Sequence, residues 1–219
     1  MVKYNHREAF VMGLPDKISG KSKQPGCEEI QAAVRKKYSE VSISLEGKFT
    51  YPTGRDGAHV LGYDLSLLAD MPADVADTFC GVGNPFSIGP VNPGESVLDI
   101  GSGAGFDLIM ASLMVGPRGR VTGIDLTPAM VDKARENLKA AGITNADVIL
   151  TGVEDMPCED SSFDLATSNG VLNLSPLKEK SFREIHRVLK PGGRLQFADI
   201  VLKEDLPGKV ASSLEAWSD

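Results

Sequence analysis

The sequence has 219 residues, of which 42% are hydrophobic and 24% are charged, as in ordinary globular proteins. Its formal net charge of −7 leaves no basic stripe that would displace counterions, which argues against a nucleic-acid partner. No apolar run has the length of a membrane span, and the N-terminus lacks the apolar core of a signal peptide, so we expect a cytoplasmic protein without membrane contacts. Three scattered cysteines are too few for a disulfide framework or a tetrahedral zinc site.

The first part of the chain, residues 1–72, is expected to contain a leader, one helix and a substrate lid. Residues 1–26 show no hydrophobic period. Apolar residues spaced by four within Glu28–Tyr38 predict an amphipathic helix. Phe49–Asp64 interleaves glycines and aromatic residues without a period, which predicts either a connecting loop or a lid over a binding site.

Two short helical patterns, at 64–70 and 73–79, lie on either side of the start of the second part, residues 73–219. From Gly94 onward strand and helix patterns alternate regularly, with strands predicted at 96–100, 120–126, 146–151, 162–168 and 194–200, and helices at 104–115, 128–141 and 177–189. Thr127 is expected to cap a helix, and Pro191–Gly193 to end the last one. Such alternation predicts an α/β, Rossmann-like, doubly wound and mostly parallel sheet, with ligands bound beyond the carboxyl ends of its strands.

A glycine-rich turn follows the first of these strands, in the stretch SVLDIGSGAG. Its spacing is G-x-G-x-G, and Phe106 stands where the dinucleotide fingerprint has its third glycine. Asp125 ends the second strand about twenty residues later, where an acidic side chain holds ribose hydroxyls. The glycines alone would also suit a plain strand-to-helix turn. Together with Asp125 they favour an adenosine-containing ligand over a pyrophosphate-bearing one, which disfavours a nicotinamide-dependent dehydrogenase.

Several motifs carry a resemblance to a known family. VLDIGSGAG, the acidic end of GIDL and the late HRVLKPGGRL together resemble the class I S-adenosylmethionine-dependent methyltransferases over about residues 75–200. YPTGRDGAHVLGYD, FCGVGNPF, GSGAGFD, TGVEDMP and SNGVLNLS resemble the arsenite methyltransferase branch in particular. The resemblance implies S-adenosylmethionine as cofactor and a small-molecule substrate.

The same resemblance implies a set of cofactor-binding residues. The glycines would face the methionine and ribose, Asp125 the ribose hydroxyls, and Asn169 the sulfonium and the substrate. Leu126 and Val153 would enclose the adenine, with Glu154 near its amino group. The implied set is Asp99, Gly101, Ser102, Gly103, Gly105, Asp125, Leu126, Val153, Glu154 and Asn169.

The substrate implied by the resemblance is arsenite or another trivalent arsenical, which needs soft thiolate ligands. Cys80 matches a family cysteine, so it is the expected arsenic ligand and, with Asn169, a catalytic residue. The chain departs from the family at Gly170, where the family has cysteine, and it ends at Asp219, short of the next family cysteine. Methylation of a quinone or other small metabolite, and a cofactor-binding remnant without turnover, therefore remain alternatives.

The fifth predicted strand, 194–200, has no residues after it for the antiparallel pair that completes the family's sheet. It would then be an edge, with Leu195, Phe197 and Ile200 incompletely covered. We expect either a homodimer paired through this edge or a truncated form of reduced stability. The alternative is a stable monomer in which the N-terminal segment and a terminal helix, suggested by the spacing of Val210, Leu214 and Trp217, cover the edge.

Overall fold

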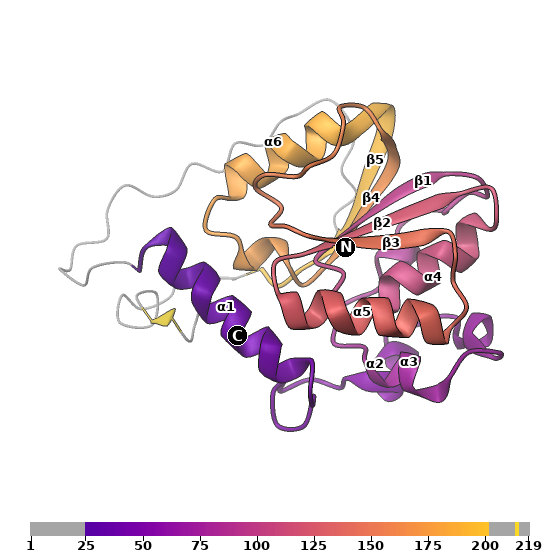
Figure 1. The fold of residues 1–219 in the computed structure, drawn as a ribbon, viewed down its shortest axis with the longest axis horizontal. Coiled ribbons are helices and arrows are strands. Elements are labelled where there is room, and N and C mark those ends of the chain that lie inside the picture. Colours follow the sequence, from indigo (N-terminus) through magenta and orange to yellow (C-terminus); the bar gives the residue numbers. More distant parts are fainter. Residues whose placement is uncertain (1–24, 202–212, 215–219) are drawn as a thin grey trace.

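Five parallel strands form the centre of the computed structural model, which describes residues 25–201, 213 and 214 (Figure 1). Their order across the sheet is β3-β2-β1-β4-β5, and every neighbouring pair is parallel. The order reverses between β1 and β4, so the carboxyl ends of these two strands flank the topological switch point. The expected doubly wound sheet is confirmed. The strands are β1 Ser96–Ile100, β2 Arg120–Asp125, β3 Ala146–Leu150, β4 Phe163–Asn169 and β5 Leu189–Ala198.

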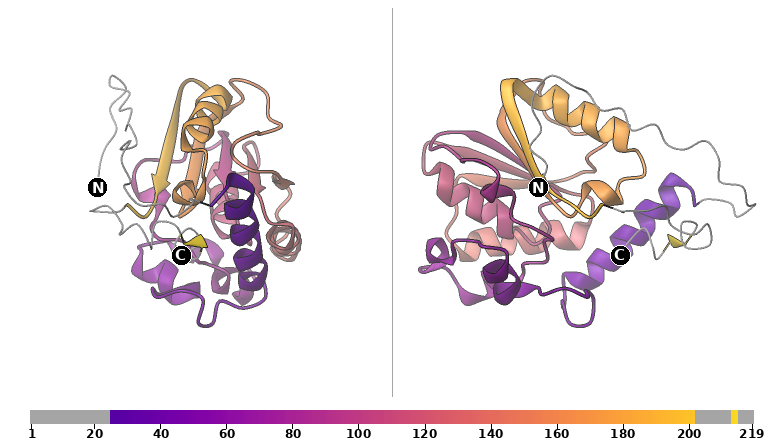
Figure 2. Two further views of the ribbon diagram at one scale, coloured as in Figure 1. Left: turned by 90° about the vertical axis from the view of Figure 1, so that its left-hand side faces the viewer. Right: turned by 180° about the vertical axis from the view of Figure 1, so that it is seen from behind.

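Helices cover both faces of this sheet, with α4 and α5 on one face and α6 on the other (Figure 1). The first helix, α1, contacts α5 and stands beyond the end of the sheet (Figure 2). Within the described ranges, three short 3₁₀ helices join the larger elements at Leu65–Leu68, Pro85–Ser87 and Leu172–Leu174. The helices are α1 Cys27–Val41, α2 Gly54–Val60, α3 Ala73–Asp77, α4 Phe106–Val115, α5 Pro128–Ala140 and α6 Lys178–Val188.

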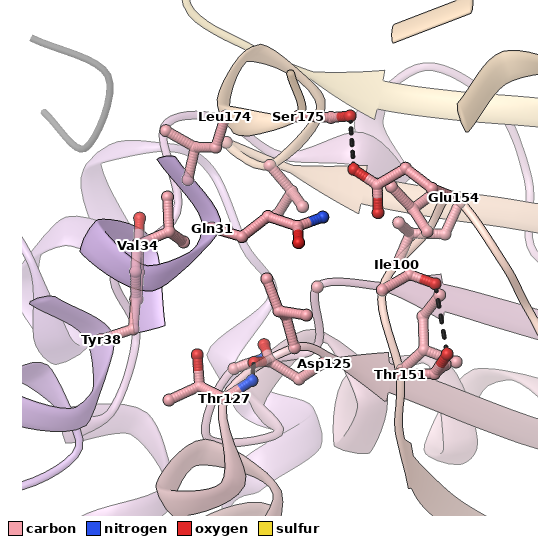
Figure 3. Close-up of a pocket in the computed structure, with 18 of the residues that line it drawn as sticks. Gln31, Val34, Tyr38, Ile100, Asp125, Thr127, Thr151, Glu154, Leu174 and Ser175 are labelled. Carbon is pink, nitrogen blue, oxygen red and sulfur yellow. Dashed lines mark hydrogen bonds between the residues drawn. The ribbon is translucent and has the colours of Figure 1, made fainter. Parts of the chain in front are cut away.

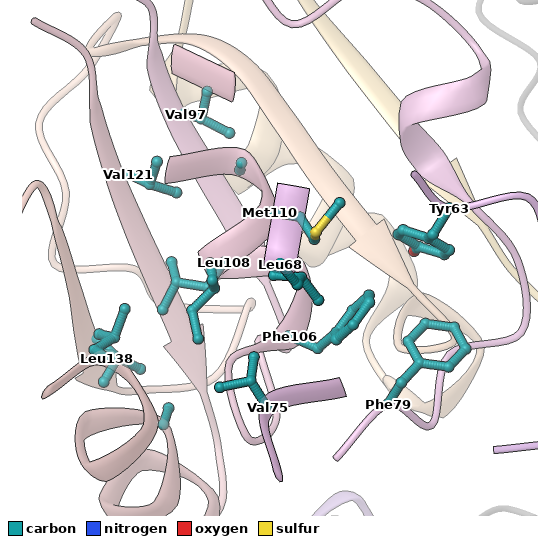
Figure 4. Close-up of a cluster of buried hydrophobic side chains, with 14 of the residues drawn as sticks. Tyr63, Leu68, Val75, Phe79, Val97, Phe106, Leu108, Met110, Val121 and Leu138 are labelled. Carbon is teal, nitrogen blue, oxygen red and sulfur yellow. The ribbon is translucent and has the colours of Figure 1, made fainter. Parts of the chain in front are cut away.

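The alternation of side chains along β1 creates two hydrophobic layers. Val97 packs with the α4 and α5 side, whereas Leu98 and Ile100 pack on the α6 side. On the α4 side, the rings of Tyr63, Phe79 and Phe106 meet edge to face at 4.9–5.2 Å between centroids (Figure 4). Side chains from before and after residue 72 thus share one core, and the proposed boundary there stays a prediction.

Two stretches differ from the sequence-based expectation. Phe49–Asp64 was expected to be irregular, but it contains α2, in which Gly57 packs so closely that a Cβ would lie 2.4 Å from the Pro52 carbonyl oxygen. Pro191–Gly193 was expected to precede the last strand, but β5 runs through it from Leu189. The pairing shifts register near Phe163, which is how a sheet accommodates a Pro-Gly-Gly insertion at its edge.

The strand β5 lies at one edge of the described sheet, as expected. Phe197 of β5 is 40% exposed and Ile200, which lies just beyond the strand, is 44% exposed, as expected, whereas Leu195 is partly buried against the core. The centroid of the Phe182 ring of α6 lies 6.3 Å from the centroid of the Phe197 ring. Val210 and Trp217, on which the expected terminal helix depends, lie outside the described residues. None of the helices in the described part is long and apolar enough to span a membrane.

Candidate active site

A cavity of about 780 Å³, its mouth to solvent included, opens at the carboxyl ends of β1, β2 and β4 (Figure 3). Its position is the switch point of the sheet, where doubly wound folds bind their ligands. The residues that line it are Gln31, Val34, Tyr38, Cys80, Ile100, Gly101, Gly103, Ile124, Asp125, Leu126, Thr127, Thr151, Gly152, Val153, Glu154, Asn169, Gly170, Val171, Leu174, Ser175 and Pro176.

The glycine loop after β1 forms the floor of the cavity. Gly101 has φ +68° and a Cβ there would lie 2.3 Å from the Val171 side chain, so only glycine fits. Gly103 has φ +51°, and a Cβ there would point into open space. The loop is tied to the neighbouring strand, because Ser102 N–H donates to the Ile124 carbonyl at 2.9 Å. A ligand can therefore approach bare backbone on a fixed loop.

Asp125 joins this loop to the helix that follows β2. Its two carboxylate oxygens accept backbone N–H groups, from Gly103 at 3.0 Å and from Thr127 at 2.8 Å. Burial raises the pKa of Asp125, and these hydrogen bonds oppose that rise. Thr127 is the N-cap residue of α5 as expected, but its side chain makes no capping hydrogen bond. Each Asp125 oxygen keeps a lone pair that can accept from a ligand hydroxyl.

The remaining walls combine apolar surface with negative charge. Leu126 and Val153 supply apolar surface, and the buried Glu154 accepts a hydrogen bond from Ser175 Oγ at 2.7 Å. Gln31, Val34 and Tyr38 reach in from α1 on the opposite side (Figure 3). The described lining holds two carboxyl side chains and neither lysine nor arginine. Such a site favours a cationic ligand.

Cys80 is the cysteine of the described cavity lining, and it is partly buried. Burial, followed by the charges of Asp125 and Asp107, raises the pKa of its thiol to about 12. Tyr51 donates its hydroxyl to the Cys80 carbonyl at 3.1 Å. Burial likewise raises the pKa of Asp107 to about 6, although hydrogen bonds from Asn169 and Tyr63 oppose that rise. At neutral pH the Cys80 thiol is therefore protonated.

The structure brings most of the expected site residues to this one cavity. Gly101, Gly103, Asp125, Leu126, Val153, Glu154, Asn169 and Cys80 all line it. Asp99, Ser102 and Gly105 lie outside the lining that the described residues form. Asp99 is buried between β1 and β4, where it accepts from Thr167 Oγ1 at 3.0 Å, and burial and Asp107 raise its pKa well above its usual range. Gly105 packs against Ala134 of α5.

Other features of the site were missed from the sequence. The α1 side chains line the cavity, whereas Phe49–Asp64 contributes no residue to the described lining, so its role as a lid stays a prediction. The spacing in α1 showed an apolar face but not what that face would meet. The contacts of Asn169 with Asp107 and Tyr63 were also unforeseen. The sequence signal that could have pointed to Asp107 is its place in the motif GSGAGFD.

Comparison with known proteins identifies a matching family model and several relatives of this chain. The methyltransferase domain model matches residues 91–219. The chain is 38% identical over 197 residues to an arsenite methyltransferase of Halobacterium salinarum, covering 84% of this chain and 50% of that protein. It is 36% identical over 118 residues to a demethylmenaquinone methyltransferase of Listeria welshimeri, covering 54% of this chain and 50% of that one.

Among solved structures, the chain resembles an arsenic(III) S-adenosylmethionine methyltransferase from Chlamydomonas reinhardtii. The TM-score is 0.60 and the sequence identity 40%, over 66% of this chain and 51% of that one. The chain thus spans about half the length of the relatives described here.

Proposed function

Because this chain belongs to the methyltransferase domain family, we propose that it transfers a methyl group from S-adenosylmethionine to a small molecule, namely arsenite or another trivalent arsenical. One observation carries this proposal. The glycine loop, the Asp125 carboxylate and the Cys80 thiol line a single cavity at the switch point of the sheet.

The cavity residues fit S-adenosylmethionine, which carries an adenosine, two cationic centres and one carboxylate. The open space above Gly103 admits the ligand to bare backbone, and the two carboxyl side chains of the lining suit its net positive charge. Asp125 would accept the ribose hydroxyls, while Leu126 and Val153 would pack against the adenine. When bound, S-adenosylmethionine supplies a methyl group on a sulfonium, which is already a strong methyl donor.

The chain then has to align the acceptor with that methyl group. Fixed positioning of two reactants contributes on the order of several kcal/mol, up to roughly 7–11 kcal/mol in ideal cases. An oxygen or nitrogen acceptor often needs a general base as well. A trivalent arsenic atom attacks through its own lone pair and needs no base, so its requirement is a soft ligand that holds it in place.

Cys80 would supply that ligand. Its thiol is protonated at neutral pH, since burial and nearby carboxyl groups raise its pKa to about 12. An arsenic–hydroxide bond can break as the arsenic–sulfur bond forms, and the thiol proton leaves with the hydroxide as water. The step therefore balances without a separate base. The names of the Halobacterium and Chlamydomonas relatives support this choice of substrate.

A quinone or another small metabolite is the second candidate substrate. The similarity to a demethylmenaquinone methyltransferase favours it, as does the apolar surface of Val34, Val171 and Leu174 at the cavity.

We propose that either reaction takes place in the cytoplasm, because Cys27, Cys80 and Cys158 are all free thiols, as is usual in reducing compartments.

The proposal is tested with methyl-labelled S-adenosylmethionine and a panel of arsenite and quinone acceptors. We expect label in the arsenical, and we expect Cys80→Ser to abolish this transfer. Cys158→Ser is the matched control, because Cys158 is also a partly buried free thiol but lies outside the described cavity lining. Label in a quinone alone would favour the second candidate. Binding of S-adenosylhomocysteine without transfer to any acceptor would indicate a cofactor-binding remnant.

A further inference from the structure

The side chain of Asn169, at the end of β4, forms hydrogen bonds with the backbone of the turn Gly81–Gly83, which is distant in the sequence. Its Oδ1 accepts the N–H of Val82 at 2.8 Å and that of Gly83 at 3.1 Å. Its Nδ2 donates to the Gly83 carbonyl at 2.9 Å. Three hydrogen bonds therefore join one amide to two successive residues of the turn that directly follows Cys80.

The orientation of this amide is determined by its surroundings. Oδ1 faces two backbone N–H groups, which only donate, whereas Nδ2 also faces Asp107 Oδ2 at 2.9 Å and the Tyr63 hydroxyl at 3.0 Å. Tyr63 in turn donates to Asp107 Oδ1 at 2.7 Å. A flipped amide would oppose donor to donor and oxygen to carboxylate. The network thus fixes the Asn169 side chain in one pose.

Close packing holds the same turn from other sides. A Cβ at Gly81 would lie 2.1 Å from Asn169 Nδ2, and a Cβ at Gly83 would lie 2.5 Å from the Ala198 Cβ at the end of β5. The backbone of the turn therefore rests directly on Asn169 and on β5. The Cys80 carbonyl, where the turn begins, accepts the Tyr51 hydroxyl. On the other side of Cys80, the Phe79 carbonyl accepts the Gly54 N–H at 2.6 Å, so the main chain is held on both sides of the thiol.

We propose that Asn169 is a positioning residue, whose amide clamps the turn Gly81–Gly83 and thereby sets the place and exposure of the Cys80 thiol at the cavity wall. The inference rests on the proposed function in taking Cys80 as the substrate contact. It differs from a direct role beside the sulfonium, because the chain itself already engages the polar atoms of Asn169: Oδ1 accepts two backbone N–H groups, and the two hydrogens of Nδ2 are shared among three acceptors.

The first test measures the reactivity of the Cys80 thiol directly and needs no arsenical. In a Cys27→Ser/Cys158→Ser background, the rate of Cys80 alkylation by iodoacetamide is measured at fixed pH, together with S-adenosylhomocysteine affinity. We expect Asn169→Ala to raise the alkylation rate at least fivefold while affinity changes less than threefold. Asn145→Ala is the matched control, since the Asn145 amide also clamps backbone carbonyls, those of Ser112 and Gly116, away from the cavity lining. It should leave the rate within twofold.

An unchanged alkylation rate in Asn169→Ala, or an equal rise in Asn145→Ala, overturns the proposal. If Asn169→Ala does not fold, Tyr63→Phe takes its place, because it removes one hydroxyl from the same network. That variant should raise the rate at least twofold, and no rise overturns the proposal.

The second test uses turnover with arsenite. Asn169→Ala should raise KM for arsenite at least fivefold and KM for S-adenosylmethionine less than threefold, and equal changes in both overturn the proposal. If arsenite is not methylated at all, the proposed substrate fails, while the alkylation rates still decide the role of Asn169.

Discussion

Asp125 shows how a single side chain can shape a loop and present an acceptor at the same time. Its two oxygens hold the N–H groups of Gly103 and Thr127, so the glycine loop and the start of α5 share one anchor. The remaining lone pairs face a cavity lined by uncharged and acidic residues. Loss of this side chain should therefore affect ligand binding far more than folding of the sheet.

Asp125→Ala is expected to weaken S-adenosylhomocysteine binding by about 1.5–3 kcal/mol, the usual contribution of hydrogen bonds to a charged group. Isothermal calorimetry measures the affinity, and circular dichroism checks that the sheet remains intact. Asp132→Ala is the control, because the Asp132 side chain on α5 is 74% exposed. Equal affinities of wild type and Asp125→Ala would show that Asp125 does not contribute to ligand binding.

At the scale of elements, an ion pair joins β5 to the turn that precedes β1. Arg194 Nη1 and Nη2 each lie 2.8 Å from a Glu95 oxygen, and Asn92 donates to the same carboxylate. The Glu95 side chain is 15% exposed, and the hydrogen bonds from Arg194 lower the pKa of Glu95 to about 2. A lowered folded-state pKa means that the pair stabilises the fold above pH 4.5 and loses this effect as the pH falls toward 2.

Glu95→Gln should lower the free energy of unfolding by on the order of 1–2 kcal/mol at pH 7. The difference between variant and wild type should shrink as the pH falls through the range between about 4.5 and 2. Urea denaturation at pH 7 and pH 3 measures both effects. Glu136→Gln serves as control, since its side chain is 71% exposed and its oxygen lies 3.7 Å from Lys133 Nζ. A pH-independent difference would contradict the assignment.

The helix α1 is the element through which the N-terminal part of the chain reaches the cavity. Gln31, Val34 and Tyr38 lie on its inner face, and it contacts α5. An isolated helix of this length is marginal in water, so its order depends on what it packs against. A ligand that touches three of its side chains should therefore stabilise it.

We expect S-adenosylhomocysteine to slow amide hydrogen exchange in α1 by about tenfold, corresponding to roughly 1.4 kcal/mol of added local stability. Mass spectrometry of peptides from Cys27–Val41, with and without ligand, measures the effect. Peptides from α6 provide the internal comparison, because no α6 residue is in the described cavity lining. Equal slowing in both helices would show global stabilisation instead of contact with α1.

At the scale of the whole molecule, the predictable part of the site is the part that strand ends determine. Gly101, Asp125 and Asn169 each end or follow a parallel strand, and topology alone brings such residues together. Val82 and Gly83 precede Asn169 by 87 and 86 positions in the sequence. The geometry of their hydrogen bonds to Asn169 depends on packing that no local pattern encodes. For the same reason the face of α1 was visible in the sequence, while its place against the cavity was not.

The edge at β5 is where the whole chain is expected to meet another copy of itself. Edge strands present unpaired backbone N–H and C=O groups, and Phe197 and Ile200 add exposed apolar surface here. We expect the average mass from light scattering to rise above that of the monomer as concentration increases, and Phe197→Lys to reduce that rise. Val60→Lys is the control, because Val60 is 71% exposed on α2 and lies outside the sheet. A monomer at every concentration would contradict pairing. So would strong exchange protection, in a dilute monomeric sample, of the β5 amides that point away from β4, because another part of the chain would then already cover the edge.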